Sequence, residues 1–146
     1  ADAGLDIHEK PYYEYRILNH WDNLDDTVER GYAGLSMWEW TAKEIPTERI
    51  HHYGELCASV GLNGAVLNNV NANPLILDKE HIERVAQIAN ILREYGITTY
   101  LSIKWTSPVT LDGLKSGDPL DPKVRQWWKN KAAEIYTAIP ISAAFS

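Results

Sequence analysis

GAVLNNVNAN (residues 64–73) is the stretch that decides the fold, because a short apolar run in it turns polar at its C-terminal end. Two further segments repeat this pattern, YRILNHWDN (residues 15–23) and ITTYLSIKWTSP (residues 97–108). Each apolar run is too short for a typical helix, and together they are rich in β-branched and aromatic residues, which predicts three β-strands. Strands buried in a parallel sheet have this continuous apolar character.

A first helix is predicted between the first two strands. Thr47 is in position to cap its start, and Gly61 is in position to stop it after about Val60. Its apolar residues recur at helical spacing and are expected to share one face: Tyr53, Leu56, Cys57 and Val60.

Two more helices are predicted farther along the chain. Asp78 can cap the second, which ends at Gly96. The apolar residues at helical spacing in the second are Ile82, Val85, Ala86, Ala89 and Leu92. Asp121 followed by Pro122 predicts the start of the third. Successive turns of the third are marked by Val124, Trp127, Trp128, Lys131 and Ile135.

The alternation of strands and helices predicts an α/β fold. Right-handed βαβ crossovers would form a parallel sheet, and residues 139–146 (IPISAAFS) are apolar enough to begin a fourth strand. A flavodoxin-like open sheet and a partial (β/α)8 TIM barrel both fit this order. No GxGxxG or GxxxxGK[ST] loop follows a strand, which disfavours a nucleotide-binding sheet.

Composition and charge narrow the class of partner. A chain of 146 residues, 45% apolar and 23% charged, fits one folded domain. A net charge of −6 gives no basic stripe for nucleic acid or anionic membranes, and no run approaches 18 apolar residues. Cys57 is the single cysteine and forms no internal disulfide. We therefore expect a neutral or weakly charged ligand; the sequence leaves the compartment open.

Polar and aromatic residues gather at the C-terminal end of each predicted strand, where ligands bind in parallel α/β architectures. They are Asn19, His20, Trp21, Asp22 and Asn23, then Asn68, Asn69, Val70, Asn71 and Asn73, then Lys104, Trp105, Thr106 and Ser107. Amides beside indole rings suit hydroxyl-rich ligands such as sugars. The alternative for each asparagine is a turn in which the side chain bonds its own backbone.

Catalytic groups are not specified by the residues alone. His20 has no defined partner in the sequence, and we expect it to be a structural, hydrogen-bonded histidine. His51 and His52 are adjacent, and no HExxH, CxxC or GxSxG motif occurs, so no metal site or nucleophile is predicted. The carboxylates after the first strand are expected mostly in solvated loops or caps: Asp22, Asp25, Asp26, Glu29 and Glu39. Trp38 and Trp40 form either a flap over a cleft or a packing contact.

Four long motifs resemble the opening of the catalytic barrel in the family 67 α-glucuronidases. They are HWDNLDDTVERGYAGLSMWEW (residues 20–40), ASVGLNGAVLNNVNAN (residues 58–73), YGITTYLSIKWTSP (residues 95–108) and GDPLDPKVRQWWKNKAAEIYTAIP (residues 117–140). The similarity runs from about residue 16 to residue 140. It implies residues 1–13 as a linker or remnant before the barrel and residues 14–146 as the N-terminal part of a TIM-barrel catalytic domain.

The resemblance also implies a reaction and a ligand. The family removes 4-O-methyl-glucuronic acid from xylo-oligosaccharides with inversion and without a metal or organic cofactor. Trp21 and Val70 fall where the family shapes its pocket around the uronic-acid ring and its 4-O-methyl group. Asn69 and Lys104 are their neighbours at strand ends and are weaker substrate-binding candidates.

This chain departs from the family pattern after the fourth motif, because it ends in ISAAFS where the family continues to its catalytic carboxylates. We therefore expect a fragment that is inactive alone and whose partners are the remainder of the barrel or a second copy of the chain, together with a glucuronic-acid-substituted xylo-oligosaccharide. A carbohydrate-binding module without chemistry and a purely structural half-barrel are the alternatives.

Overall fold

The structure is a computed structural model that describes residue 8 and residues 10–31 and 34–139. Three short strands, β1 (Ile17–Asn19), β2 (Gly64–Val66) and β3 (Thr98–Tyr100), form one sheet in the order β1-β2-β3, with both pairs parallel. Ile17 is opposite Gly64, and Gly64 is opposite Thr98. The three predicted strands and their parallel pairing are confirmed, although each ladder is shorter than its apolar run. The predicted fourth strand lies outside the described residues, apart from Ile139.

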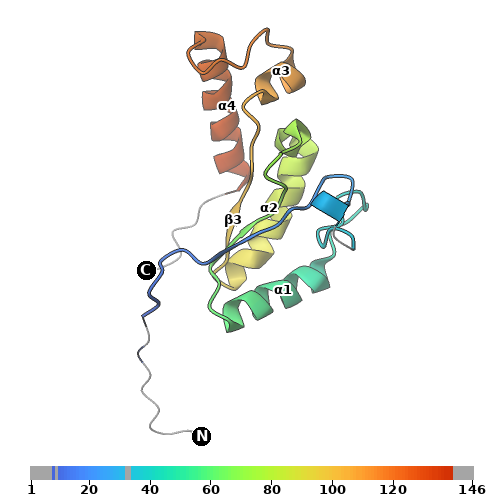
Figure 1. The fold of residues 1–146 in the computed structure, drawn as a ribbon, viewed down its shortest axis with the longest axis vertical. Helices are drawn as coiled ribbons and strands as arrows, with labels where there is room; N and C mark the ends of the chain where they lie inside the picture. The colour runs from blue at the N-terminus through green and yellow to red at the C-terminus, as the bar shows by residue number, and fades with distance from the viewer. Residues whose placement is uncertain (1–7, 9, 32–33, 140–146) are drawn as a thin grey trace, which may run out of the picture.

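Helices connect and follow the strands in the predicted order (Figure 1). The α-helices are α1 (Thr47–Ser59), α2 (Lys79–Glu94), α3 (Ser107–Asp112) and α4 (Pro122–Ala138), and the 3-10 helices are η1 (Glu29–Gly31) and η2 (Pro74–Leu77). The three predicted helices correspond to α1, α2 and α4. The short α3 and the two 3-10 helices were not predicted. This α/β arrangement with an open parallel sheet is consistent with part of a TIM barrel.

The helix caps follow the predicted chemistry at α2 and α4. Asp78 accepts a hydrogen bond from the backbone N–H of His81, and Asp121 accepts one from Lys123. The prediction that Thr47 caps α1 is wrong. Thr47 is the first helical residue, and Pro46 occupies the cap position without a side-chain bond. Proline has a fixed φ that suits a helix start and leaves no side-chain acceptor there.

The buried face of α1 differs from the predicted one. Ile50, Gly54 and Cys57 are buried, whereas Leu56 and Val60 are 66% and 73% exposed. The reason is the close approach of α2: a Cβ at Gly54 would lie 2.4 Å from the ring of Tyr95. The glycine therefore defines the contact line between the helices, and Leu56 and Val60 lie to one side of it.

The hydrophobic core lies between the sheet and helices α1 and α2. It includes Trp38 and Trp40, which are almost completely buried. The structure therefore supports the packing alternative for these two residues. On the sheet, Gly64 has no side chain, and a Cβ there would lie 2.9 Å from both Ile17 and Tyr100. The side chains of β1 and β3 thus come together over β2.

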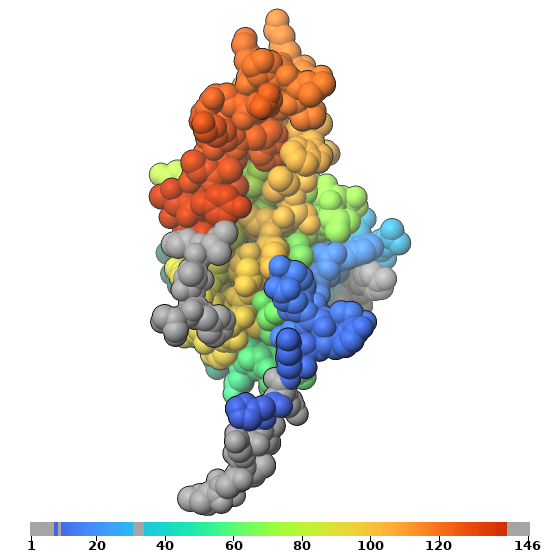
Figure 2. All heavy atoms as spheres, turned by 90° about the vertical axis from the view of Figure 1, so that its left-hand side faces the viewer, coloured from blue at the N-terminus to red at the C-terminus, as the bar shows by residue number. Residues whose placement is uncertain are grey.

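The other end of the molecule is less compact. Helix α4 lies at the upper left of Figure 1, beside α3 and away from α1. Val124 is its buried residue, while Trp127, Trp128 and Ile135 on the predicted face are half-buried. Figure 2 shows the segment around β3 at the surface between α4 and the N-terminal segment. Part of the sheet is therefore open to solvent on this side.

Within the described residues, none of the helices is both long enough and apolar enough to cross a membrane.

Candidate functional site

Two adjacent asparagines hold together the carboxyl ends of the three strands. The Asn68 amide donates to the backbone oxygen of Ser102 at 3.1 Å and accepts from the backbone N–H of Ser102 at 2.9 Å. The Asn69 amide bonds instead to the segment after β1. The two adjacent side chains bond to different segments, so one dipeptide after β2 connects it to the segments that follow both of its neighbouring strands.

Asn69 uses its whole amide within the chain. Its nitrogen donates to Asn23 Oδ1 at 2.9 Å and to Glu29 Oε2 at 2.5 Å, and its oxygen accepts from the Asn71 N–H at 2.9 Å. The residue is 3% exposed. An amide has two N–H donors, and both are occupied here. The contacts of this predicted substrate-binding residue are thus with the loops that form the site.

Trp21 and Val70 are each next to a residue of a backbone hydrogen bond that joins their two segments. The N–H of Asn69 donates to the carbonyl oxygen of Asp22 at 2.8 Å. Trp21 is partly buried, and its ring lies 4.9 Å from the guanidinium carbon of Arg30. Val70 is 50% exposed. The two residues for which the family resemblance implies a pocket therefore lie on adjoining segments at one edge of the sheet.

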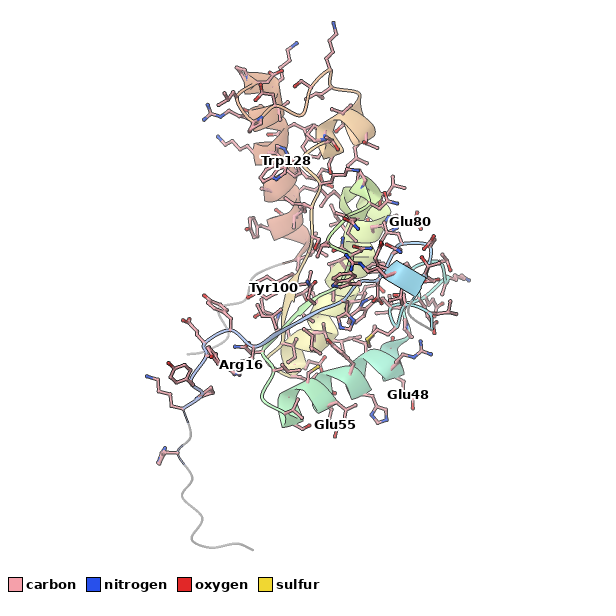
Figure 3. The ribbon with its side chains drawn as sticks, viewed as in Figure 1. Arg16, Glu48, Glu55, Glu80, Tyr100 and Trp128 are labelled. Carbon is pink, nitrogen blue, oxygen red and sulfur yellow. The ribbon has the colours of Figure 1, made fainter. Side chains whose placement is uncertain are left out.

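Lys104 lies at the same edge, after β3, and its side chain is exposed. Its backbone oxygen accepts hydrogen bonds from the N–H and hydroxyl of Ser107, which begins α3. The next residue, Trp105, is 64% exposed and makes an edge-on contact with Trp128, labelled in Figure 3, at 5.6 Å between ring centres. Trp128 contacts Trp127 in the same manner at 4.8 Å. Edge-on contacts among Trp127, Trp128 and Trp105 thus extend from α4 to this edge.

Beneath the edge, His20 and Asp22 belong to a buried polar network. The His20 Nε2 atom is 2.7 Å from the hydroxyl of Tyr53, and Asp22 accepts a hydrogen bond from the Ser36 hydroxyl at 2.6 Å. Burial lowers the pKa of His20, and the nearby Asp22 opposes this effect. Burial, with contributions from Cys57 and Asp22, raises the pKa of Tyr53. Burial therefore favours the neutral imidazole, and the hydrogen bond with Tyr53 agrees with the structural role predicted for His20.

Sequence reasoning did not identify Tyr53 or Ser36 as members of this region, and it named Glu29 only among the carboxylates expected mostly in solvated loops or caps. Tyr53 was assigned to a helix face only, and its partner His20 is 33 positions away. Ser36 lies 14 positions from Asp22, and Glu29 lies 40 positions from Asn69. No local spacing pattern predicts such pairs, so the sequence contained no signal for them.

Other carboxylates after β1 are mostly occupied by the backbone of their own loop. Asp26 accepts hydrogen bonds from the N–H groups of Trp40 and Thr41, at 2.6 and 3.2 Å. Asp25 accepts hydrogen bonds from the hydroxyl and N–H of Thr27, and these bonds lower the pKa of Asp25. Glu39 pairs with Arg49 at 2.6 Å. These acids act as loop caps and an ion pair, as the sequence predicted for most of them.

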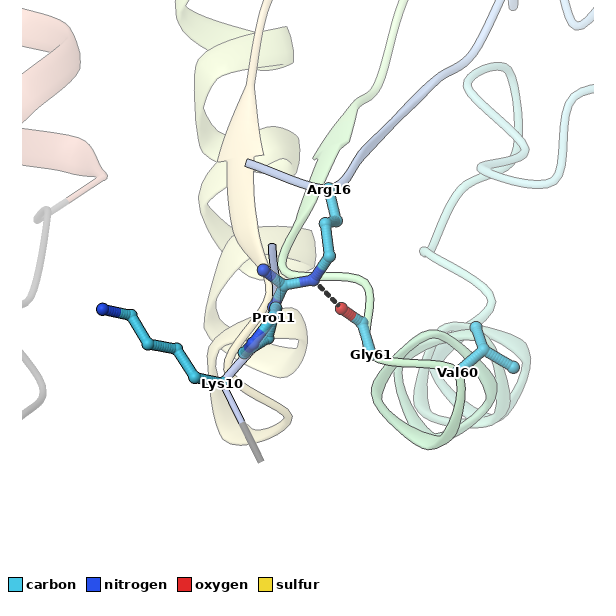
Figure 4. A pocket seen from close by; sticks show the side chains of 5 residues that line it. All are labelled: Lys10, Pro11, Arg16, Val60 and Gly61. Atoms are coloured by element: carbon cyan, nitrogen blue, oxygen red, sulfur yellow. Dashed lines mark hydrogen bonds between the residues drawn. The ribbon is translucent and has the colours of Figure 1, made fainter. Parts of the chain in front are cut away.

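An open pocket of about 440 Å³ lies at the opposite, amino edge of the sheet (Figure 4). Lys10, Pro11, Arg16, Val60 and Gly61 line it. The Arg16 guanidinium donates to the carbonyl oxygens of Gly61 at 2.5 Å and Tyr13 at 2.6 Å. Because the Arg16 guanidinium is bonded to backbone oxygens, this arginine has a structural role at the pocket. In barrel enzymes the active site forms at the other edge.

In the described part of the chain, no group of three or more His, Cys, Asp or Glu side chains is placed to hold a metal ion. His51 is instead 3.0 Å from the hydroxyl of Tyr95 through Nδ1.

Comparison with known proteins places these motifs in one family. The model of the glycosyl hydrolase family 67 middle domain matches residues 2–146. The chain is 40% identical over 144 residues to a probable alpha-glucuronidase A of Aspergillus terreus, and 41% identical over 144 residues to that of Aspergillus oryzae. Both alignments cover 98% of this chain and 17% of the relative. Alpha-glucuronidase A of Emericella nidulans is 42% identical over 141 residues, covering 92% of this chain. The chain spans about a sixth of the length of these relatives.

Proposed function

Because the chain belongs to glycoside hydrolase family 67, we propose that it forms the first part of the catalytic barrel of an α-glucuronidase. Relatives named alpha-glucuronidase A match nearly its whole length. The parallel βαβ order and the polar carboxyl edge agree with this proposal. In the proposed division, residues 14–146 are the start of the barrel and residues 1–13 precede it.

The proposed reaction is hydrolysis, with inversion, of the α-1,2 bond of (4-O-methyl)glucuronic acid on xylo-oligosaccharides. Trp21 packs against the uronic-acid ring, and Val70 contacts the 4-O-methyl group. The observation that supports this pairing most strongly is the hydrogen bond from Asn69 N–H to Asp22 O, since it holds the two segments side by side. Lys104, exposed at the same edge, is a further substrate-binding candidate.

Asn69 has a more indirect part in this proposal. Its amide is fully bonded to Asn23, Glu29 and Asn71. It therefore contributes to the substrate site by fixing the two loops that carry Trp21 and Val70. Positioning of this kind accelerates a reaction because the reacting bond is held in the correct geometry before the chemical step.

The acid and the base are proposed to come from later strands of the complete barrel. Inversion requires two carboxyl groups about 6.5 to 9.5 Å apart on either side of the bond. All the carboxylates after β1 that the sequence analysis considered are engaged in hydrogen bonds or an ion pair within the chain. They are Asp22, Asp25, Asp26, Glu29 and Glu39. We therefore expect the 146-residue chain to bind and orient substrate without cleaving it.

Release of 4-O-methyl-glucuronate from an aldouronic acid tests the proposal. The 146-residue chain should give no product, and the complete protein that contains this segment should give product with inverted configuration by NMR. Turnover by the short chain would refute the assignment of the acid and base. Absence of turnover by the complete protein would refute the activity.

A carbohydrate-binding module is the second candidate, and the exposed Trp105 ring supported by Trp128 favours it. Exposed aromatic rings with a fixed orientation are suited to packing against sugars. Titration with glucuronoxylan oligosaccharides separates the two functions, because the complete protein would then bind to saturation without releasing product.

A further inference from the structure

We infer that Trp105 binds the xylose chain of the substrate, as a second contact beside the one at Trp21. The inference rests on the proposed function, because it assumes that a uronic acid linked to a xylo-oligosaccharide is seated against Trp21. It deepens that function by adding a site for the uncharged part of the substrate. Such a site determines how strongly the complete protein prefers longer oligosaccharides.

The exposure of a supported aromatic ring is the first argument. Trp105 is 64% exposed, yet its ring makes an edge-on contact with Trp128, with 5.6 Å between the ring centres. Trp128 is half-buried and contacts Trp127 in the same way, and the Trp127 indole N–H donates to Asp112 in α3. A contact of this kind covers only part of the Trp105 ring and leaves the rest available for packing against a sugar.

The backbone that carries the ring is also held in place. The Lys104 carbonyl oxygen accepts hydrogen bonds from the N–H and the hydroxyl of Ser107, at 2.9 and 2.6 Å. A Cβ at Gly117 would lie 3.2 Å from the Trp105 carbonyl oxygen, so the loop after α3 packs closely against this residue. Because the segment is ordered before a ligand arrives, binding costs less conformational entropy than it would on a free loop.

The position of Trp105 relative to Trp21 is the third argument. The strands lie in the order β1-β2-β3, and Trp21 follows β1 whereas Trp105 follows β3. Neighbouring strands are about 4.8 Å apart, so the ends of β1 and β3 are separated by about 10 Å. A sugar ring seated against Trp21 and Val70 occupies the ends of β1 and β2. Trp105 is therefore placed for a different part of the same ligand, which in the proposed substrate is the xylose chain.

The residue after Trp105 supplies a polar group beside the ring. Thr106 is exposed and precedes α3, but its side chain makes no capping hydrogen bond to that helix. A threonine hydroxyl can both donate to and accept from the hydroxyl groups of a sugar. Ligand sites commonly combine an aromatic surface with a few polar groups of this kind. A neutral sugar ring therefore suits both side chains.

A comparison of substrates that differ in chain length tests the role. In the complete protein, Trp105→Ala should lower kcat/KM about 3- to 10-fold for aldotetraouronic acid, with three xylose units, the range for loss of one aromatic contact. For aldobiouronic acid, with one xylose unit, the change should be less than about twofold. The loss should be mainly in KM, because the contact is the same before and during the chemical step.

Two further variants serve as controls for this comparison. Trp105→Phe should keep most of the preference for the longer substrate, since it retains an aromatic face. Tyr136→Ala removes another exposed aromatic ring, near the C-terminal end of α4, and should leave the kinetics on both substrates unchanged.

Two results would overturn the inference. Equal losses on the two substrates would show that Trp105 supports the fold or the Trp21 pocket, and unchanged kinetics on both would show that it does not contact the substrate. Failure of the proposed function is distinguishable, since the unmodified protein would then turn over neither substrate. In that case, calorimetric titration of the complete protein with xylotriose, which has no uronic acid, still tests Trp105. The inference predicts binding that Trp105→Ala abolishes, and it fails if binding is absent or survives the substitution.

Discussion

Replacement of Asn69 by alanine tests whether its amide holds the loops of the carboxyl edge. The change removes two donated hydrogen bonds, to Asn23 and Glu29, and one accepted from the Asn71 N–H. It leaves the backbone bond from the Asn69 N–H to Asp22 intact. The substitution is therefore a local loss of side-chain bonding in a residue that is almost completely buried.

The expected cost follows from the three bonds. A neutral hydrogen bond contributes about 1 kcal/mol net, and one to a charged group such as Glu29 about 1.5 to 3 kcal/mol. The gross loss is thus about 4 kcal/mol. Asn23 and Glu29 are only partly buried, so water replaces part of what they lose. We expect Asn69→Ala to lower the free energy of unfolding by about 2 to 3 kcal/mol.

Urea unfolding of the 146-residue chain, followed by tryptophan fluorescence, measures this cost. Val70→Ala is the matched control at the next position, where a half-exposed side chain without polar atoms should cost less than about 1 kcal/mol. Hydrogen exchange should show lost protection at Asn71 in the Asn69 variant only. The reasoning is refuted if Asn69→Ala costs less than about 0.5 kcal/mol, or if the two variants are equally destabilised.

Two further predictions concern the packing and the buried histidine. Gly54→Ala should lower the free energy of unfolding, measured in urea, by about 1 to 3 kcal/mol, because its methyl group would clash with the Tyr95 ring. This loss is expected despite the better helix propensity of alanine, and Ser59→Ala on the same helix is the near-neutral control. No loss of stability in Gly54→Ala would contradict this contact. The lowered pKa of His20 means that the unfolded chain, with a value of about 6.5, takes up a proton before the folded chain does as pH falls. Stability should therefore decrease as the pH is lowered from about 7.5 through 6.5 and towards the pKa of His20 in the folded chain. His20→Gln should reduce this pH dependence of stability. An identical pH profile for the two proteins would argue against the role of His20.

Local chemistry made several parts of the fold predictable. Asp78 and Asp121 sit at the helix starts where their side chains accept backbone N–H groups, and Gly61 and Gly96 adopt positive φ at the helix ends. Such signals involve residues a few positions apart. The predicted cap of α1 was wrong because the helix begins at Thr47 itself and Pro46 occupies the cap position. Helix α3 was missed because Pro108, a helix-start residue, was included in the polar end of the third strand.

The candidate site could be predicted as a place but not as a set of contacts. Polar strand ends share one edge of any parallel sheet, so the joint position of the segments with Trp21, Val70 and Lys104 followed from the strand order. The bonds of Asn69 did not, because its partners Asn23 and Glu29 are 46 and 40 positions away. Spacing therefore indicated which segments meet, whereas the hydrogen-bonding state of each side chain required the structure.

Kinetics of Trp21→Ala in the complete protein test the central claim, that this segment forms a wall of an α-glucuronidase pocket. The account predicts a loss of at least about tenfold in kcat/KM for the aldouronic acid, because a buried aromatic contact with the sugar ring is removed. Tyr12→Ala, at a ring that is 93% exposed on the amino side of β1, should retain the activity of the unmodified protein. Unchanged kinetics for Trp21→Ala, or an equal loss for Tyr12→Ala, would contradict the claim.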